Sequence, residues 1–288
     1  MNWSDFKKLI KLRLTFLVVF SASISFLIGN KVDGGTIAWG NWVKLIVGGF
    51  LVTAAANCFN EIIEKDLDKL MKRTADRPFP TGRMNTGQGL VLGLFMGIAG
   101  TYLLGSLNLL TGLLSVFSIL LYAFAYTPLK RKSPIAVFVG AIPGALPPLI
   151  GYVASHGKID ALALILFGIQ FVWQFPHFWA IAWVLDDDYK LAGFRLLPTG
   201  KRDLTSAVII FITTIILIPI SFLPTYLGYG GYYVGSISLG LGIAFLYLAF
   251  ELMRSLQITS AKWLMYASFI YLPVVQLMFL FDFIGKGK

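Results

Sequence analysis

The sequence predicts an all-α integral membrane protein with nine transmembrane helices around a central cavity. The chain of 288 residues is 57% hydrophobic and only 13% charged, whereas about a quarter of the residues of a soluble domain are charged. Its apolar runs are long enough to cross a bilayer, which takes about 20 residues each. The connections are too short for a soluble domain, so residues 1–288 should form a single transmembrane domain. The nine runs lie near 12–30, 42–60, 88–106, 108–126, 134–154, 160–184, 205–228, 232–252 and 263–284.

Lysine and arginine are distributed unequally between the connections. With the N-terminus on the inner side, 19 of the 24 basic residues fall in inner segments. Cytoplasmic loops of membrane proteins are enriched in Lys and Arg, so we expect a cytoplasmic N-terminus and an outer C-terminus. The net charge of +10 then reflects topology and contact with lipid headgroups rather than nucleic acid binding. The outer side receives Lys31, Lys44, Lys158, Lys286 and Lys288.

The segment before the first apolar run combines Trp3, Phe6, Leu9 and Ile10 with lysines. It fits either a short amphipathic helix on the inner surface or a plain basic flank. The first run is too long for the core of a signal peptide and is followed by further spans, so it should be a retained helix. The single cysteine, Cys58, excludes an internal disulfide and is expected simply to pack between helices.

The longest charged stretch, residues 57–84, begins at the end of the second apolar run. Read as a helix, Asn60, Glu64 and Asp68 recur every four residues and spread over about 80° of one face. Carboxylate and amide oxygens suit a hard cation such as Mg²⁺. Basic side chains that could bind diphosphate oxygens follow: Lys69, Lys72, Arg73, Arg77 and Arg83. The stretch therefore predicts a metal–diphosphate site.

A simpler interpretation covers the basic residues of this stretch on their own. Inner loops are basic for topological reasons, and Glu–Lys spacing can merely stabilise a helix. The set of Asn60, Glu64 and Asp68, called the acidic column below, is less easily explained in this way, because carboxylates at the edge of a membrane are usually functional.

The fourth run ends with Tyr122 and Tyr126, followed by Lys130 and Arg131. An interfacial aromatic belt is the favoured interpretation of the two tyrosines. Lys130 and Arg131 could neutralise a phosphate or could simply mark the inner side. The fifth run should line the interior or a cavity, because prolines interrupt it and a lipid-facing helix tolerates them poorly. These prolines are Pro143, Pro147 and Pro148.

The sixth run places polar side chains inside an aromatic-rich span, where they are costly unless they are used. They are Gln170, Trp173, Gln174 and His177. His177 fits either a substrate contact or a neutral core histidine. Three acids and a tyrosine follow at the inner end, where they could face the first acidic column or form a solvated loop: Asp186, Asp187, Asp188 and Tyr189.

The acidic column together with MKRTADRPFPTG at residues 71–82 resembles the first signature of the UbiA superfamily of intramembrane prenyltransferases. The stretches YTPLKRKSPIAVFVGAIPGALPPLIGY, WQFPHFWAIAW and DDDYKLAGFRLLP are similar to its heme-farnesylating branch, and the resemblance covers essentially the whole chain. Two departures stand out. Glu64 replaces the more common aspartate, and the second acidic motif is compressed into three adjacent aspartates, of which Asp188 matches the family position best.

The resemblance implies a UbiA-type bundle in the cell inner membrane, with a cavity open to the cytoplasmic face and laterally to lipid. Farnesyl diphosphate would be the donor, heme b the acceptor and Mg²⁺ the cofactor, and heme O the product. Implied partners besides membrane lipid are a heme A synthase or assembly proteins of a terminal oxidase. Metal ligands would come from Asn60, Glu64, Asp68, Asp187 and Asp188, with Arg73 and Arg77 assisting catalysis. Substrate contacts would come from Tyr126, Lys130, Arg131, Trp173, His177 and Tyr189.

Two other functions remain open at this stage. The same diphosphate machinery could prenylate a quinone or chlorophyll precursor. A transporter of an anionic lipid or metabolite is a second alternative, although we see no internal repeat of the kind that transporters often show. The chain has no Walker-type glycine loop, CxxC motif or serine elbow, so ATPase, redox-metal and hydrolase functions lack support.

Overall fold

The structure, a computed structural model, describes residues 3–285 as a bundle of helices. Lys286 and Lys288, assigned above to the outer side, lie outside the described residues. Within residues 3–285, nine helical segments are long and apolar enough to cross a membrane, which confirms the predicted fold class. They are α2 (Leu12–Val32), α3 (Trp39–Asp68), α4 (Thr86–Gly105), α5 to α6 (Leu109–Leu129), α7 (Ala136–His156), α8 (Ala161–Leu191), α9 (Leu204–Tyr226), α10 (Tyr232–Ser255) and α11 (Ile258–Phe281).

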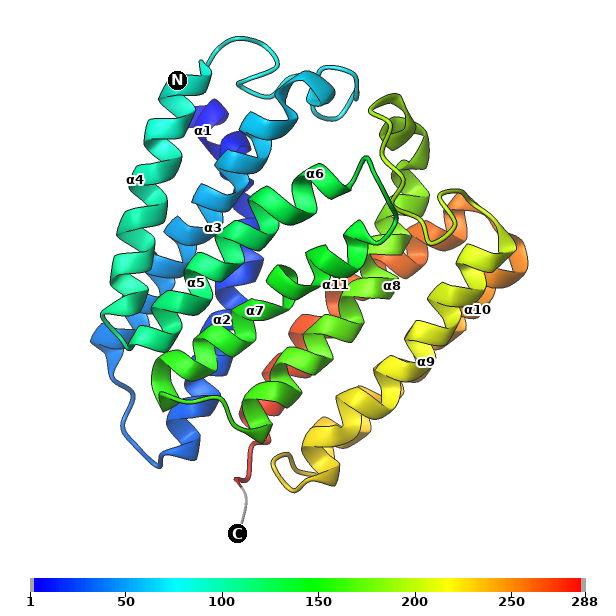
Figure 1. The fold of residues 1–288 in the computed structure, drawn as a ribbon. Coiled ribbons are helices and arrows are strands. Elements are labelled where there is room, and N and C mark those ends of the chain that lie inside the picture. The colour runs from blue at the N-terminus through cyan, green and yellow to red at the C-terminus, as the bar shows by residue number, and fades with distance from the viewer. Residues whose placement is uncertain (1–2, 286–288) are drawn as a thin grey trace.

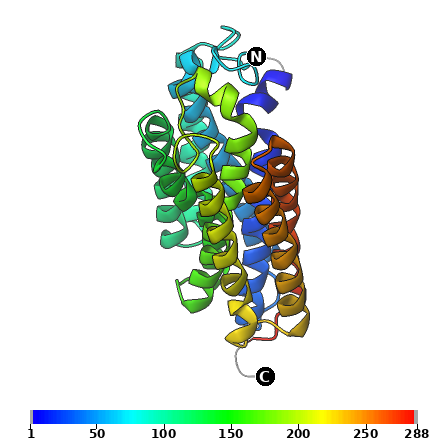
Figure 2. The same ribbon diagram turned by 90° about the vertical axis from the view of Figure 1, so that its right-hand side faces the viewer.

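The charged connections gather at one end of this bundle. The loop after α3 and the loop after α8 lie at the end where α1 (Trp3–Leu9) is found, and α11 finishes at the opposite end (Figures 1 and 2). The loop after α3 and the loop after α8 each follow an even number of crossings, so two acidic segments that are more than 100 residues apart in sequence lie at the same end of the molecule. The odd total of nine crossings within residues 3–285 places the end of α11 at the opposite end.

α7 is the most deeply buried of the spans. Its three prolines lie inside a continuous helix, and Gly151 lets its backbone touch α2. A Cβ atom at Gly151 would fall 1.9 Å from the carbonyl oxygen of Ala22, and small residues allow such close approach between membrane helices. The expectation that this segment lines the interior is confirmed, because Gly140 and Pro143 form part of the wall of a central pocket.

Two spans continue well beyond their apolar runs. α3 runs on to Asp68, and α8 runs on to Leu191. Their acidic residues are therefore fixed on rigid helices rather than on loops. At the N-terminus, α1 is a helix as the amphipathic interpretation expects, with Leu9 buried and Trp3 exposed.

Candidate active site

Five polar side chains of α3 are buried toward the charged end of the bundle: Asn57, Asn60, Glu61, Glu64 and Asp68. Glu61, Glu64 and Asp68 are spaced i, i+3 and i+7, so they share one helix face. Glu61 was not predicted from the sequence, because we considered only residues spaced by four from Asn60, and Glu61 precedes Glu64 by three. It is completely buried. Three carboxylates in one buried cluster require compensating charge.

Two cations supply that compensation. Arg77 Nη1 lies 2.7 Å from Asp68 Oδ2, and its Nε lies 3.4 Å from Glu61 Oε1. Burial alone would lower the pKa of Arg77, but the Glu61 and Asp68 carboxylates outweigh burial and raise this pKa above its usual value. Lys130 Nζ lies 2.5 Å from Glu64 Oε1. The structure therefore brings Arg77 and Lys130, both expected at the site, against the acidic column.

Asn60 connects this cluster to the N-terminal segment. Its Nδ2 donates hydrogen bonds to Glu64 Oε2 at 2.9 Å and to Thr127 Oγ1 at 3.0 Å, and its Oδ1 accepts one of 2.7 Å from Lys11 Nζ. Lys11 has φ 47° and ψ 56° at the junction of α1 and α2, a left-handed conformation that is uncommon outside glycine. Burial lowers the pKa of Lys11 to about 8. The sequence showed Lys11 only as one basic flank residue among several.

The three adjacent aspartates at the end of α8 point in different directions. Because the helix continues past them, successive side chains are rotated by about 100°. Asp186 is buried and paired with Lys190, whereas Asp187 is largely exposed and bonded to Arg202. Only Asp188 is bonded to the loop after α3, since its Oδ1 accepts a hydrogen bond of 2.8 Å from the Lys72 amide. This geometry disagrees with the prediction that Asp187 is a metal ligand.

No three His, Cys, Asp or Glu side chains within residues 3–285 are arranged as a ready-made metal site. The oxygens nevertheless suit Mg²⁺. Glu61 Oε2, Asp68 Oδ1 and Asp188 Oδ2 are buried without a hydrogen-bond partner among the described residues. A buried carboxylate oxygen without a partner is costly. These atoms are thus available to a hard cation, which prefers oxygen ligands.

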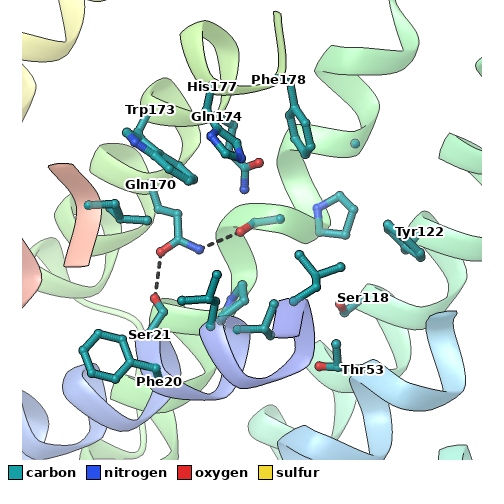
Figure 3. A pocket seen from close by; sticks show the side chains of 18 of the residues that line it. Phe20, Ser21, Thr53, Ser118, Tyr122, Gln170, Trp173, Gln174, His177 and Phe178 are labelled. Atoms are coloured by element: carbon teal, nitrogen blue, oxygen red, sulfur yellow. Dashed lines mark hydrogen bonds between the residues drawn. The ribbon is translucent and has the colours of Figure 1, made fainter. Parts of the chain in front are cut away.

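A central pocket of about 230 Å³ lies between α2, α3, α7, α8, α11 and the π-helix η1 (Leu121–Tyr126) (Figure 3). Tyr122 and Tyr126, both on η1, line it and are half-buried. Their place in the pocket favours the substrate contact expected of Tyr126 over an interfacial belt. π-Helical turns are rare and are often found at functional sites.

One edge of the pocket opens to the surroundings. Leu14, Leu17 and Phe269 line the pocket there and are each more than 40% exposed.

Polar groups occupy one wall of this otherwise apolar pocket. Ser21 Oγ donates to Gln170 Oε1 at 2.7 Å, and Gln170 Nε2 donates to the Gly144 carbonyl at 2.7 Å (Figure 3). Gln276 Nε2 also donates to Gln170 Oε1, at 2.9 Å. Trp173 and His177 line the same pocket. Of the polar residues expected in the sixth span, all four are pocket residues.

Tyr126 and Lys130 join the pocket to the charged cluster. Tyr126 lines the pocket, and Lys130 Nζ lies 5.0 Å from the centre of its ring. The Arg73 guanidinium carbon lies 5.9 Å from the centre of the Tyr189 ring, so these two expected residues are also neighbours. Arg131 is exposed. The site thus consists of an acid–base cluster beside an aromatic pocket.

Comparison with known proteins shows similarity along nearly the whole chain. The profile of the UbiA prenyltransferase family matches residues 18–272. A protein from Cytophaga hutchinsonii named protoheme IX farnesyltransferase is 46% identical over 277 residues, with 96% of each chain covered. A protein of the same name from Christiangramia forsetii is 41% identical over 285 residues, covering 97% of this chain and 93% of the other.

Solved structures show the same fold at low sequence identity. A digeranylgeranylglyceryl phosphate synthase superimposes with a TM-score of 0.81 at 19% identity, covering 97% of each chain. A UbiA homolog from Archaeoglobus fulgidus bound to GPP and Mg²⁺ superimposes with a TM-score of 0.68 at 11% identity, covering 96% of this chain and 99% of the other.

Proposed function

Because this chain belongs to the UbiA prenyltransferase family, and its relatives at 41–46% identity are named protoheme IX farnesyltransferase, we propose that it transfers a farnesyl group from farnesyl diphosphate to a vinyl group of heme b. The observation that carries this proposal in the structure is the acid–base cluster beside an aromatic pocket, joined to it by Tyr126 and Lys130. The cluster suits the diphosphate, and the pocket suits the farnesyl chain and the porphyrin ring.

The charged end of the bundle binds and activates the diphosphate. Oxygens of Asn60, Glu61, Glu64, Asp68 and Asp188 would hold Mg²⁺, which would supply positive charge against the diphosphate. Arg77 and Lys130 are positioned beside these carboxylates and can donate hydrogen bonds to phosphate oxygens. Arg73, exposed above Tyr189, is a further donor for the leaving group.

The pocket accommodates the reacting carbons. As the bond from C1 of the farnesyl group to oxygen breaks, diphosphate leaves with the electron pair and positive charge develops on the allylic chain. The Tyr122 and Tyr126 rings stabilise this charge by cation–π attraction. The vinyl group supplies the electrons of the new carbon–carbon bond. Water then adds to the vinyl carbon that has not bonded to the farnesyl group and loses a proton, which gives the hydroxyethylfarnesyl group of heme O.

The size of the pocket requires movement during this reaction. Its volume of about 230 Å³ is below the range of roughly 300–1,000 Å³ for ligand pockets, and a heme and a farnesyl chain must both be bound. Side chains at the open edge, such as Leu14 and Leu17, are therefore expected to move outward when substrates bind.

The charged end is proposed to face the cytoplasm across the inner membrane. Support comes from the basic residues of the loops at that end, as the distribution of Lys and Arg predicts. The product would then pass to a heme A synthase or to assembly proteins of a terminal oxidase, which remains a prediction.

Mass spectrometry of extracted hemes tests the reaction. Membranes that contain the protein are supplied with heme b and farnesyl diphosphate, with and without Mg²⁺. A heme O peak that requires Mg²⁺ and is absent in Asp68→Asn supports the proposal. Prenylation of a quinone or chlorophyll precursor in a parallel acceptor panel, with heme b unchanged, would replace it with the related enzyme. No covalent product from any acceptor would favour transport.

A further inference from the structure

His177 is held in one tautomer by a chain of two hydrogen bonds. Its Nδ1 lies 2.7 Å from Ser268 Oγ, and Ser268 Oγ donates to the Met265 carbonyl at 2.6 Å. A serine hydroxyl has one proton to donate. Because that proton is used on Met265, Ser268 Oγ must accept the proton of His177 Nδ1. The other ring nitrogen, Nε2, therefore carries a free lone pair.

The imidazole ring is also fixed in position by its neighbours. It stacks on Trp173, with ring centres 4.2 Å apart and planes inclined by 16°, and it packs edge-on against Phe269 at 5.1 Å. Trp173 Nε1 donates to the carbonyl of Ser268, so the stacking partner is anchored to the same turn of α11. His177 is thus a rigid part of the pocket wall.

His177 Nε2 has no hydrogen-bond partner within residues 3–285. The residue is 8% exposed and lines the central pocket, beside Gln174 and Trp173 in Figure 3. Nδ1 is used on Ser268, so Nε2 is the ring nitrogen that remains for a ligand in the pocket.

This arrangement is that of a metal-ligating histidine. Such residues donate one ring N–H to a fixed acceptor, which sets the tautomer and the ring orientation and makes the other nitrogen a better ligand. Neutral imidazole is a common axial ligand of heme iron. Heme b is the substrate under the proposed function, on which this inference rests. We propose that His177 Nε2 is an axial ligand of the iron of the heme acceptor, with Ser268 as the residue that positions it.

Ligation limits how the acceptor lies in the pocket. Without it, the porphyrin ring would pack against Phe and Trp side chains with nothing to fix the position of its iron. With the iron bound to α8, the distance from the iron to the charged cluster is set by the protein. The same vinyl group is then presented to the farnesyl donor in each turnover.

Binding of heme b to purified protein tests this proposal, with an affinity tag that contains no histidine. The chain has two histidines, so His156→Ala is the matched control: His156 is bonded to Asp33, at the end opposite the charged cluster. In His177→Ala we expect affinity for heme b to fall about tenfold or more and the iron–histidine band in resonance Raman spectra to disappear. Added imidazole should restore a nitrogen-ligated spectrum. His156→Ala should match the wild type.

Iron-free protoporphyrin IX separates ligation from simple packing. Its affinity should be the same in the wild type and in His177→Ala, because it has no iron to bind. Ser268→Ala keeps Nε2 but releases the ring, so the iron–histidine band should shift and heme b affinity should fall less than in His177→Ala.

Several outcomes would overturn the proposal. Equal heme b affinity and spectra in the wild type and His177→Ala would do so, and so would an equal loss of affinity for the iron-free porphyrin. If the wild type makes heme O under either outcome, the ligation proposal fails while the proposed function stands. If the wild type neither binds heme b nor makes heme O yet prenylates another acceptor, the proposed function fails and the ligation proposal falls with it.

Discussion

Asp188 accepts a hydrogen bond of 2.8 Å from the backbone amide of Lys72, a residue 116 positions away in the sequence. This bond fastens the end of α8 to the loop after α3. The two acidic segments are therefore joined by a hydrogen bond to the main chain, although their like charges repel. One oxygen of Asp188 is used in this contact, and the other is buried without a partner among the described residues.

Asp188→Asn and Asp187→Asn should differ strongly although the residues are adjacent. We expect Asp188→Asn to lower turnover about 10- to 100-fold, because it removes the charge that faces the diphosphate site. Asp187→Asn should stay within about twofold of the wild type, because Asp187 is exposed and bonded to Arg202. The test compares initial rates of heme O formation in the two variants. Equal losses of rate would indicate that Asp187 is a metal ligand after all.

Arg77→Ala should cost both stability and activity. It leaves Glu61 and Asp68 buried without their cation, and breaking a buried ion pair costs about 3–5 kcal/mol. Arg254→Ala is the control, since its pair with Glu251 is exposed and surface pairs contribute about 0–1 kcal/mol. Denaturant or thermal unfolding in detergent measures both. Similar stability of the two variants would show that the charged cluster is hydrated.

Glu61→Gln should increase the Mg²⁺ concentration that half-maximal turnover requires. Glu61 is fully buried, and its Oε2 has no partner in the described part of the chain, so loss of its charge weakens the metal site. Glu251→Gln, which lies at the exposed Arg254 pair, should leave the Mg²⁺ dependence unchanged. A chelator should abolish turnover of the wild type, and added Mg²⁺ should restore it. Full activity in the presence of the chelator would show that turnover does not require a metal ion.

Gly140→Ala should lower turnover with little effect on diphosphate binding. A Cβ atom at Gly140 would fall 2.6 Å from Tyr126 Cδ2, so the ring must move within the pocket. Gly168→Ala is the control, because a Cβ there would meet nothing within 4 Å. Kinetics with varied farnesyl diphosphate should show a reduced kcat at nearly constant KM. Wild-type kcat in Gly140→Ala would mean that the position of Tyr126 does not matter.

The spans could be predicted because each is an apolar run of membrane length, and all nine are found. The limits of the apolar runs do not give the helix ends, because hydrogen bonding along a helix continues where hydropathy falls. The spacing of Asn60, Glu64 and Asp68 indicated that α3 continues to Asp68, whereas the extension of α8 to Leu191 was not predicted. Without that extension, the separate directions of the three aspartates on α8 could not be foreseen.

The charged site was partly readable from residue spacing. The column of Asn60, Glu64 and Asp68 is buried as a group, and its period of four residues was visible in the sequence. Glu61 was missed although its spacing to Glu64 and Asp68 is equally helical. Lys11 could not be found at all, because its role depends on a left-handed residue that turns the chain between α1 and α2.

The exposed edge of the pocket determines which substrate concentration controls the rate, the one in the lipid or the one in water. Since Leu14, Leu17 and Phe269 are part of the pocket wall and are also exposed, we expect a membrane-dissolved substrate to reach the site from the lipid. Turnover then depends on the mole fraction of heme b in the bilayer. Adding empty lipid vesicles at constant total heme should slow the reaction, just as dilution slows a reaction in solution.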